Sequence, residues 1–371
     1  MKINLISAFG DPKSPKTWSG TTNNVYKALL AADSLGETYS ACDNNILYKA
    51  AKQVMRLYYK LAFYKGKNHM MMPFRFKWWR YLSAQSGHDY LKSAETKNLL
   101  HFSTLSLPMI TAKNGENHYC LIDATWDIWS KGATNMDVIK PADRQVIEQL
   151  DAKSFQQVKH IFSISEYVKT NLIEHYQIPA TKITVVGTGT GIIQPFYGKK
   201  DYSNGNILFV AKGRFEDKGG KIVLEAFEHL LKSFPNLTLS IIGQNDYSGF
   251  IKHPNIKTYG FIDLEQLQDI FNTCSLFIMP ALHEPWGLVY IEAMLCKMPI
   301  VGLNKNSFPE LSQNGKFGIG ADSPDPIALA LKISILLSDP ARMEEMGLSA
   351  QAYAVENYSW AKVVSKIINA I

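Results

Sequence analysis

Two carboxylates frame the part of the chain whose residue types are best suited to chemistry. Glu284 and Glu292 bracket a proline and a glycine, and an apolar run at 275–280, typical of a strand, precedes them. Glu292 lies in a run typical of the start of a helix. A strand, a glycine-containing turn and a helix together aim backbone N–H groups and the helix dipole at an anion. Because carboxylates accept paired hydrogen bonds from neighbouring hydroxyls, these groups suit a ligand with phosphate in its middle and sugar at each end. Such a ligand is a nucleotide-sugar.

A second segment, residues 211–220, supplies cations between an expected strand and an expected helix. It contains Arg214 and Lys218. Cleavage of a sugar–phosphate bond leaves additional negative charge on the nucleoside diphosphate, and without a metal that charge requires cations positioned in advance. Arg214 can bind a phosphate through two parallel hydrogen bonds, and Lys218 adds a point charge. We therefore expect no metal cofactor.

Strand and helix patterns alternate along the chain and indicate the scaffold for these residues. The length of 371 residues favours two domains. The apolar strands are continuous, as expected of parallel sheets covered on both faces. A polar, turn-rich stretch at 194–206 predicts a linker. The expected strands are 3–9, 99–102, 120–124, 161–164, 183–186, 207–211, 237–242, 275–279 and 299–303, and the expected helices are 22–34, 165–176, 221–234 and 264–271.

The predicted fold class is therefore α/β, with two Rossmann-like, doubly wound parallel-sheet domains facing a central cleft. We place the first domain at residues 1–195, with the C-terminal helix at 357–371 packing back on it, and the second at 206–356. Ligands bind such sheets beyond the carboxyl ends of the strands. The site is therefore expected where those ends face one another.

Composition narrows the class of protein and marks one unusual segment. The four cysteines show no metal-binding spacing, and neither a signal peptide nor a membrane-spanning run is evident, so we expect a cytoplasmic protein. No acid occurs between residues 44 and 88, whereas nine lysines and arginines do. One interpretation is peripheral contact with an anionic membrane surface through residues 49–81. The other is a solvated helix face beside core aromatics. No recognised motif favours nucleic acid as a partner.

The second half of the chain resembles the retaining glycosyltransferases of GT-B fold, and within them glycosyltransferase family 4. Glu284 and Glu292 match the E-x7-E pair of that family, and the resemblance covers roughly half the chain, from Phe162 onward. Further matching segments are 257–262, 269–280, 299–301, 309–310, 314–318, 337–340 and 357–360.

The resemblance implies roles around the two acids. Glu292 is expected to bind the ribose hydroxyls of the nucleotide, and Glu284 to bind hydroxyls of the transferred sugar. The N–H groups at the helix start are expected to face the diphosphate; they belong to Gly287, Leu288 and Val289. The base is expected near Gly243 and Ile262.

The resemblance also bears on the cation loop and on the first domain. The family has an Arg and a Lys at 211–220, but this loop is shorter by one residue, which leaves Lys212 as an alternative to Lys218. Gly20 stands where the family has a loop that approaches the phosphates, and it reaches them only if the domains close; a turn glycine is the alternative. Asp123 lies where many members carry a His, so it either positions acceptor or donor sugar or caps a loop. The glycine-rich run at 187–191 departs from the family and is expected to be a flexible entrance to the linker.

Together these residues imply a metal-independent retaining transferase. It would move a sugar, a hexose such as glucose, from a nucleotide diphosphate donor to a hydroxyl of a glycan or lipid-linked acceptor in polysaccharide or glycoconjugate synthesis. UDP-sugar is the expected donor. Three alternatives stay open: a nucleotide-sugar epimerase, a phosphorylase-like or synthase enzyme on the same fold, and a non-catalytic carbohydrate- or nucleotide-binding module.

Overall fold

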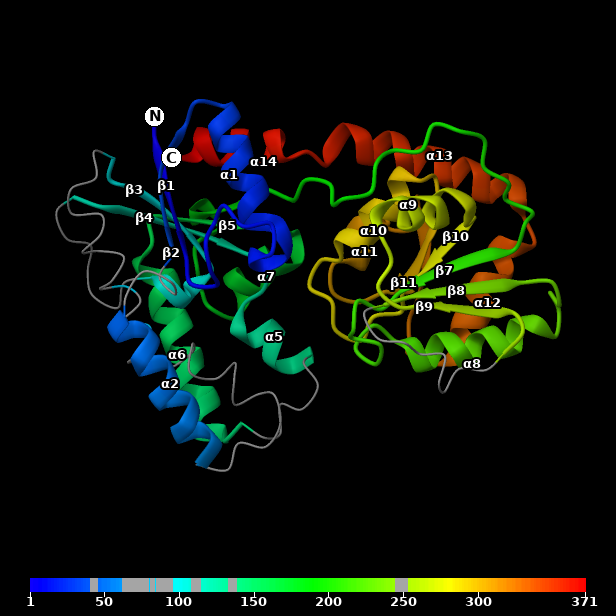
Figure 1. Ribbon diagram of the computed structural model, residues 1–371, viewed down its shortest axis with the longest axis horizontal. Helices are drawn as coiled ribbons and strands as arrows, with labels where there is room; N and C mark the ends of the chain where they lie inside the picture. The colour runs from blue at the N-terminus through cyan, green and yellow to red at the C-terminus, as the bar shows by residue number, and fades with distance from the viewer. Residues whose placement is uncertain are drawn as a thin grey trace. The chain divides into compact units, whose positions relative to one another are not determined.

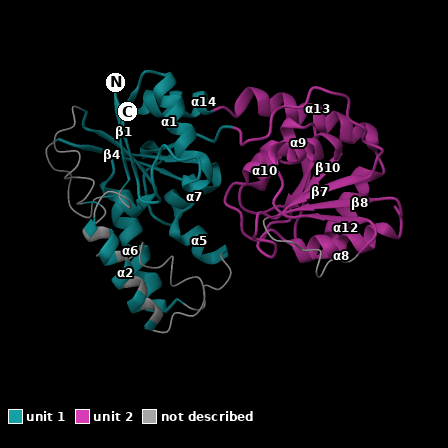
Figure 2. Ribbon diagram, viewed as in Figure 1, with its two compact units in different colours: residues 1–189, 360–371 teal, residues 190–359 magenta. Residues whose placement is uncertain are grey.

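The computed structural model describes residues 1–40, 46–61, 80, 84, 96–107, 115–132, 139–243 and 253–371. These residues form two compact units, one of residues 1–189 and 360–371 and the other of residues 190–359 (Figure 2). Each unit contains a six-stranded sheet in which every described pairing is parallel. The predicted α/β class with two parallel sheets is confirmed.

The first unit has the strand order β2-β1-β3-β4-β5-β6 (Figure 1). Its strands are β1 (Ile3–Ser7), β2 (Leu35–Ser40), β3 (Asn98–Phe102), β4 (Asn117–Ile122), β5 (His160–Ser163) and β6 (Ile183–Val185). Its helices are α1 (Thr21–Ala31), α2 (Ile46–Leu61), α5 (Trp126–Gly132), α6 (Pro141–Gln157), α7 (Glu166–Glu174) and α14 (Trp360–Ala370). Short 3-10 turns occur at Thr17–Gly20, Thr104–Ser106 and Ala180–Lys182.

Local chemistry explains where the elements of the first unit begin and what they cover. Ser165 caps α7, because its Oγ accepts a hydrogen bond from the Val168 N–H at 3.1 Å, as expected for a serine at that position. All five residues of β1 are buried, as required of a central strand covered on both faces. The last helix, α14, packs on α1, so the chain end is part of the first unit.

The second unit has the strand order β12-β11-β10-β7-β8-β9. Its strands are β7 (Asn206–Val210), β8 (Thr238–Ile242), β9 (Ile256–Tyr259), β10 (Leu276–Ile278), β11 (Ile300–Leu303) and β12 (Gly318–Ala321). Its helices are α8 (Gly220–Leu231), α9 (Leu264–Thr273), α10 (Leu288–Leu295), α11 (Phe308–Leu311), α12 (Pro326–Leu337) and α13 (Pro340–Asn357). The strand order reverses between β7 and β10, which is the point at which open α/β sheets bind ligands.

Residues 196–205, which separate the two predicted domains, are grouped with the second unit, which begins at residue 190. Lys200 fastens them there, because its buried ammonium donates to the carbonyls of Phe271, at 3.2 Å, and Asn272, at 2.8 Å, near the end of α9. Burial lowers the pKa of Lys200 to about 8. This stretch is therefore anchored by a lysine that is buried at an electrostatic cost.

Three of the four cysteines lie in the described residues, and Cys120, Cys274 and Cys296 are buried free thiols. Cys42 lies outside the described residues, as do residues 62–79 and 81 of the basic and aromatic segment. None of the helices in the described ranges combines the length and the apolar character needed to cross a bilayer.

Candidate active site

In the second unit, the loops that follow β7 and β10 are bound to each other at the switch point. The backbone carbonyl of Asp217 accepts hydrogen bonds from the N–H groups of Leu282, at 2.8 Å, and His283, at 3.2 Å. Gly219 permits this approach, because a Cβ there would lie 2.2 Å from the carbonyl oxygen of Pro280. The cation loop and the loop carrying the first acid therefore form one structure.

The structure brings three of the predicted residues together across these loops. The Lys218 ammonium donates to Glu284 Oε2, and the two side chains are only 7% and 16% exposed. Arg214 is more exposed; its Nε donates to Asp217 Oδ2 at 3.1 Å, and its Nη2 donates to the carbonyl of His283 at 3.2 Å. A buried lysine paired with a partly buried carboxylate thus lies in the same loops as a guanidinium that solvent can reach.

Three cations lie close together in the loop after β7. Burial lowers the pKa of Lys218 well below its usual value, and the nearby charges of Arg214 and Lys212 lower it further. Lys212 itself is exposed and has a left-handed backbone, with φ 46°. Glu284 and Asp217 already pair with Lys218 and Arg214, so a phosphate that binds beside these groups would share the cations with the two acids.

His283, directly before Glu284, was missed by the sequence reasoning. It is buried, and its pKa falls to about 4 because of burial and the neighbouring Arg214 charge. The imidazole is therefore neutral at pH 7 and adds no further cation. The only signal in the sequence was its position beside Glu284. That signal is weak, because a histidine next to an acid is common.

Gly287 turns the chain from the loop into α10. It is the N-cap of that helix with φ 94°, a left-handed conformation, and a Cβ there would lie 2.7 Å from the Tyr290 ring. Leu288 and Val289 follow as the first helical residues, and the first N–H groups of an α-helix lack partners from a preceding turn. The hydroxyl of Tyr290 donates to the carbonyl of Met279, which ties α10 to the end of β10.

A small pocket opens beside this turn. Its lining residues are Ala281, Glu284, Trp286, Tyr290, Leu303, Lys305, Asn306 and Phe308. The Lys305 ammonium donates to the carbonyl of Leu282 at 3.0 Å, so the loop after β11 joins the other two. Glu284 thus borders both the cations and a pocket with aromatic walls.

Glu292 is buried on α10 and binds the chain that enters the second unit. Its Oε1 accepts a hydrogen bond from the N–H of Ile192 at 3.0 Å. A Cβ at Gly191 would lie 2.1 Å from the same oxygen. The expectation of a merely flexible glycine run is therefore incomplete, because Gly191 is required for close approach to the carboxylate.

The two residues expected near the base follow neighbouring strands. Gly243 directly follows β8, and its N–H donates to the carbonyl of Tyr259, the last residue of β9, at 3.2 Å. Ile262 precedes Asp263, whose side chain caps α9 by accepting from the Gln266 N–H at 2.8 Å. Residues 244–252, which follow Gly243, lie outside the described residues.

In the first unit, the two predicted positions are joined through one tryptophan. Gly20 is the N-cap of α1 with φ 86°, a conformation that favours glycine. The indole Nε1 of Trp18, two residues earlier, donates to Asp123 Oδ2 at 3.2 Å. The loop after β1 and the loop after β4 are thereby held together.

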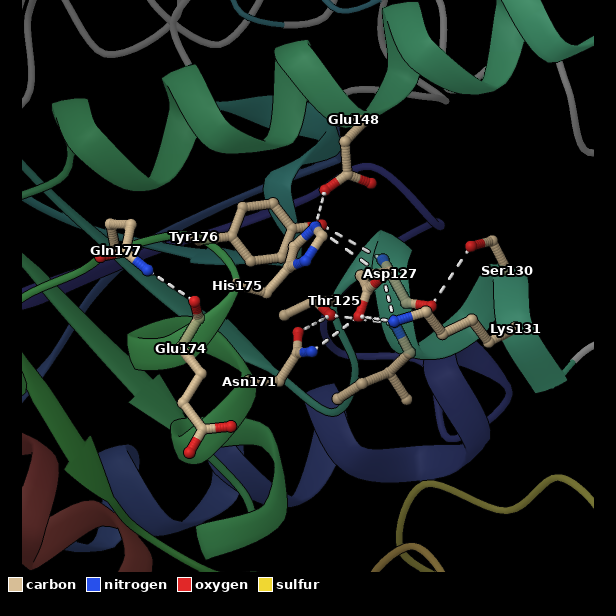
Figure 3. Close-up of polar contacts among 11 residues, drawn as sticks. Thr125, Asp127, Ser130, Lys131, Glu148, Asn171, Glu174, His175, Tyr176 and Gln177 are labelled. Carbon is tan, nitrogen blue, oxygen red and sulfur yellow. Dashed lines mark hydrogen bonds and ion pairs between the residues drawn. The ribbon is translucent and has the colours of Figure 1, made fainter.

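A polar network in the segment that follows Asp123 in the chain fixes the start of α5 (Figure 3). Asp127 accepts hydrogen bonds from the Asn171 amide at 2.7 Å and from the Lys131 ammonium, which lies 2.8 Å from its Oδ1. The Asn171 amide oxygen accepts in turn from the Thr125 hydroxyl at 2.5 Å. Sequence reasoning missed this network because its members come from α5 and α7, which are distant in the chain.

The same network continues to α6 through His175, which lies between two acids. Its Nε2 is 2.6 Å from Glu148 Oε1 and 3.7 Å from Asp127 Oδ1. The hydroxyl of Tyr176 accepts from the Asp127 N–H at 3.2 Å. Side chains from α5, from α6 and from the end of α7 thus meet around Asp127, four residues after Asp123, and Figure 3 shows them pointing toward one another.

Comparison with known proteins yields a family match and relatives of similar architecture. Residues 197–353 match the family model described as glycosyl transferases group 1. A glycogen synthase of Mycobacterium tuberculosis is 23% identical over 215 residues, which cover 55% of this chain and 52% of that protein. A GDP-mannose-dependent alpha-(1-6)-phosphatidylinositol monomannoside mannosyltransferase of Mycolicibacterium smegmatis is 29% identical over 160 residues, 38% of this chain and 41% of that protein. The chain thus spans about half the length of the curated relatives it matches.

Among solved structures, a sucrose-phosphate synthase from Thermosynechococcus elongatus superposes with a TM-score of 0.71 at 14% identity. The match covers 100% of this chain and 98% of that one. At this identity the likeness bears on the fold alone, and it confirms the GT-B class expected from the sequence.

Proposed function

We propose that this chain transfers a sugar from a nucleotide diphosphate donor to an acceptor hydroxyl, because residues 197–353 match the model of glycosyl transferases group 1. The observation that carries the proposal is the Lys218–Glu284 pair beside Arg214 at the switch point of the second sheet. Departure of a nucleoside diphosphate requires fixed cations. A carboxylate accepts hydrogen bonds from neighbouring sugar hydroxyls, and Glu284 provides one beside these cations.

The donor would lie along the start of α10. Its diphosphate would face the N–H groups of Gly287, Leu288 and Val289, with Arg214 and Lys218 neutralising the charge that develops. The ribose hydroxyls would bind Glu292, whose Oε1 already accepts one N–H. The transferred sugar would bind Glu284 beside the pocket bordered by Trp286.

Transfer would proceed with retention by attack on the same face of the sugar. The acceptor oxygen forms a bond to the anomeric carbon while the bond from that carbon to the phosphate oxygen breaks. The acceptor proton passes to the departing phosphate, so no side-chain base is assigned. NMR of the product tests this step: an anomeric configuration equal to that of the donor supports retention, and an inverted one refutes it.

The donor base is proposed to be uridine and the acceptor a glycan or a lipid-linked sugar. The relative named above as GDP-mannose-dependent makes guanosine the competing base. Thermal unfolding with UDP, GDP or ADP discriminates among them, since a ligand at one hundred times its Kd stabilises by about 2.7 kcal/mol. The largest rise in Tm should come from UDP. Equal rises for all three, or none, would contradict a specific nucleotide site.

Turnover assays separate transfer from the alternative reactions on the same fold. A transferase releases nucleoside diphosphate only when acceptor is present, beyond slow hydrolysis. An epimerase changes the donor alone, and a phosphorylase breaks down a glycan only with inorganic phosphate. A binding module shows no turnover with any donor and acceptor. Activity that survives EDTA supports the metal-independent mechanism, and activity restored only by Mg²⁺ refutes it.

A further inference from the structure

Helix α2 turns an apolar face to solvent. Five large side chains on it have exposed fractions between 58 and 83%: Ile46, Val54, Leu57, Tyr58 and Leu61. These residues are separated by three, four or eight positions, which places them along one side of the helix. Such a stripe normally packs against a core. Figure 1 shows α2 in blue at the lower edge of the first unit.

Positive charge accompanies this face. Lys49 is exposed on α2. In the sequence, Lys49, Lys52, Arg56 and Lys60 recur at intervals of three and four, which aligns these positions on a helix. No acid occurs between residues 44 and 88. An apolar stripe beside a basic one is typical of helices that lie in the plane of a membrane interface.

We propose that α2 docks on the anionic surface of a phospholipid bilayer. Val54, Leu57 and Leu61 would enter the boundary between headgroups and acyl chains, and Tyr58 would lie at the headgroup level. The basic positions would bind lipid phosphates. The apolar stripe needs an apolar environment and the basic stripe an anionic one, and an anionic bilayer surface provides both.

The charge of the segment argues against the other occupants. A second copy of α2 would bring like charges together, because the segment has no acid to pair with them. A nucleic acid would bind the positive charge but leave the apolar side chains in water. The inference goes beyond the proposed function and does not depend on it, because membrane binding is measured without turnover.

Vesicle flotation of the full chain tests the proposal. The protein should float with phosphatidylcholine vesicles that contain phosphatidylglycerol at low salt. Binding should weaken at high salt and should be much weaker with pure phosphatidylcholine, because the basic positions act through screened electrostatics. Absence of flotation at low salt with the anionic vesicles would overturn the proposal, whatever the turnover assays give.

A double variant distinguishes binding through the apolar face of α2 from non-specific adsorption of the protein to vesicles. Val54→Glu with Leu57→Glu should lower the vesicle partition coefficient by at least about tenfold, because two apolar anchors are replaced by acids. The matched control is Leu331→Glu with Ile335→Glu on α12, two side chains that are 62 and 47% exposed on another helix. It should float like wild type.

Three further measurements keep the result decisive. Circular dichroism of each variant should match wild type, and Lys49→Glu, which removes no apolar group, should also weaken flotation. Light scattering should give the same molecular mass for wild type and for the double variant. Equal flotation of wild type and the double variant would overturn the proposal. A wild type that is dimeric beside a double variant that is monomeric would overturn it as well, because the apolar face would then bind a second copy of the chain.

Discussion

The backbone N–H of Ile192 donates to Oε1 of Glu292 at 3.0 Å, and this bond links the start of the second unit to the helix that carries the second acid. One oxygen of a buried carboxylate is thereby held in place by the protein. In the proposed complex, the other oxygen binds the ribose. Orientation of that carboxylate is thus set before a ligand arrives, which reduces the entropy lost on binding.

Replacement of Glu292 should weaken nucleotide binding. Glu292→Ala should raise the Kd for the nucleotide by about ten- to one-hundredfold, since a hydrogen bond to a charged group contributes about 1.5–3 kcal/mol. Glu292→Gln, which still accepts from the Ile192 N–H, should lose less. Calorimetric titration measures both, with Glu265→Ala on α9, an exposed acid, as the control. A Kd for Glu292→Ala equal to that of wild type would refute the ribose assignment.

Gly191→Ala should destabilise the second unit. The new Cβ would lie 2.1 Å from Glu292 Oε1, so the chain or the carboxylate must move, at a cost of about 1–3 kcal/mol. Thermal unfolding should show a lower Tm and weaker nucleotide binding. At Gly260, by contrast, an added Cβ meets no atom within 4 Å. Gly260→Ala should therefore leave Tm nearly unchanged, and equal losses in both variants would argue against a specific contact at Gly191.

The buried ammonium of Lys200 should make stability depend on pH in the alkaline range. Its pKa is lowered from 10.5 to about 8 by burial, so the folded state loses the proton first as pH rises. Between about pH 8 and 10.5 the unfolded state binds more protons at this lysine than the folded state does. The free energy of unfolding therefore increases with pH over this range. The total is on the order of 3 kcal/mol from 10.5 − 8 = 2.5 pH units.

Urea unfolding of wild type and Lys200→Met across this range measures the effect. As pH rises from 8 to 10.5, the unfolding free energy of wild type should increase relative to that of Lys200→Met. Lys199→Met, at the exposed neighbouring lysine, should parallel wild type. A constant difference between wild type and Lys200→Met would show that the Lys200 pKa is not lowered.

Asp127 should contribute acid sensitivity to the first unit. Burial opposes its charge, but hydrogen bonds from Lys131 and Asn171 outweigh burial and lower the pKa of the carboxyl. The stabilisation is therefore full above the unfolded pKa, near 3.8, and is lost as pH falls through the folded value. Asp127→Asn should unfold more easily at neutral pH and lose less stability than wild type below about pH 4. Parallel acid-unfolding curves for the two proteins would contradict this role.

The central strands could be predicted from sequence, whereas several edge strands could not. Apolar runs such as 207–211 and 299–303 correspond to β7 and β11, which have neighbours on both sides. The strands left out were β2, β9 and β12, and all three are edges of their sheets. An edge strand is only partly covered, so polar residues such as those of β2 (LGETYS) carry no apolar signal.

The candidate site was predictable where residue types were unusual and adjacent in sequence. Glu284, Arg214 and Lys218 were identifiable, and the structure brings all three into one pair of connected loops. The close contact between Gly191 and Glu292 could not be predicted, because it joins two segments that are distant in the sequence. His283 was equally hidden, since its neutrality arises from burial and from charges that folding brings near.

The rate of sugar transfer by Arg214→Ala tests the account most directly. Arg214 is partly exposed, so its loss should leave the fold intact, and the charge it places at the departing diphosphate should matter only during transfer. We predict a kcat about 10²–10³ lower with nucleotide Kd changed far less, and near-normal kcat for Lys221→Ala, an exposed lysine at the start of α8. Wild-type kcat in Arg214→Ala would contradict the proposed site.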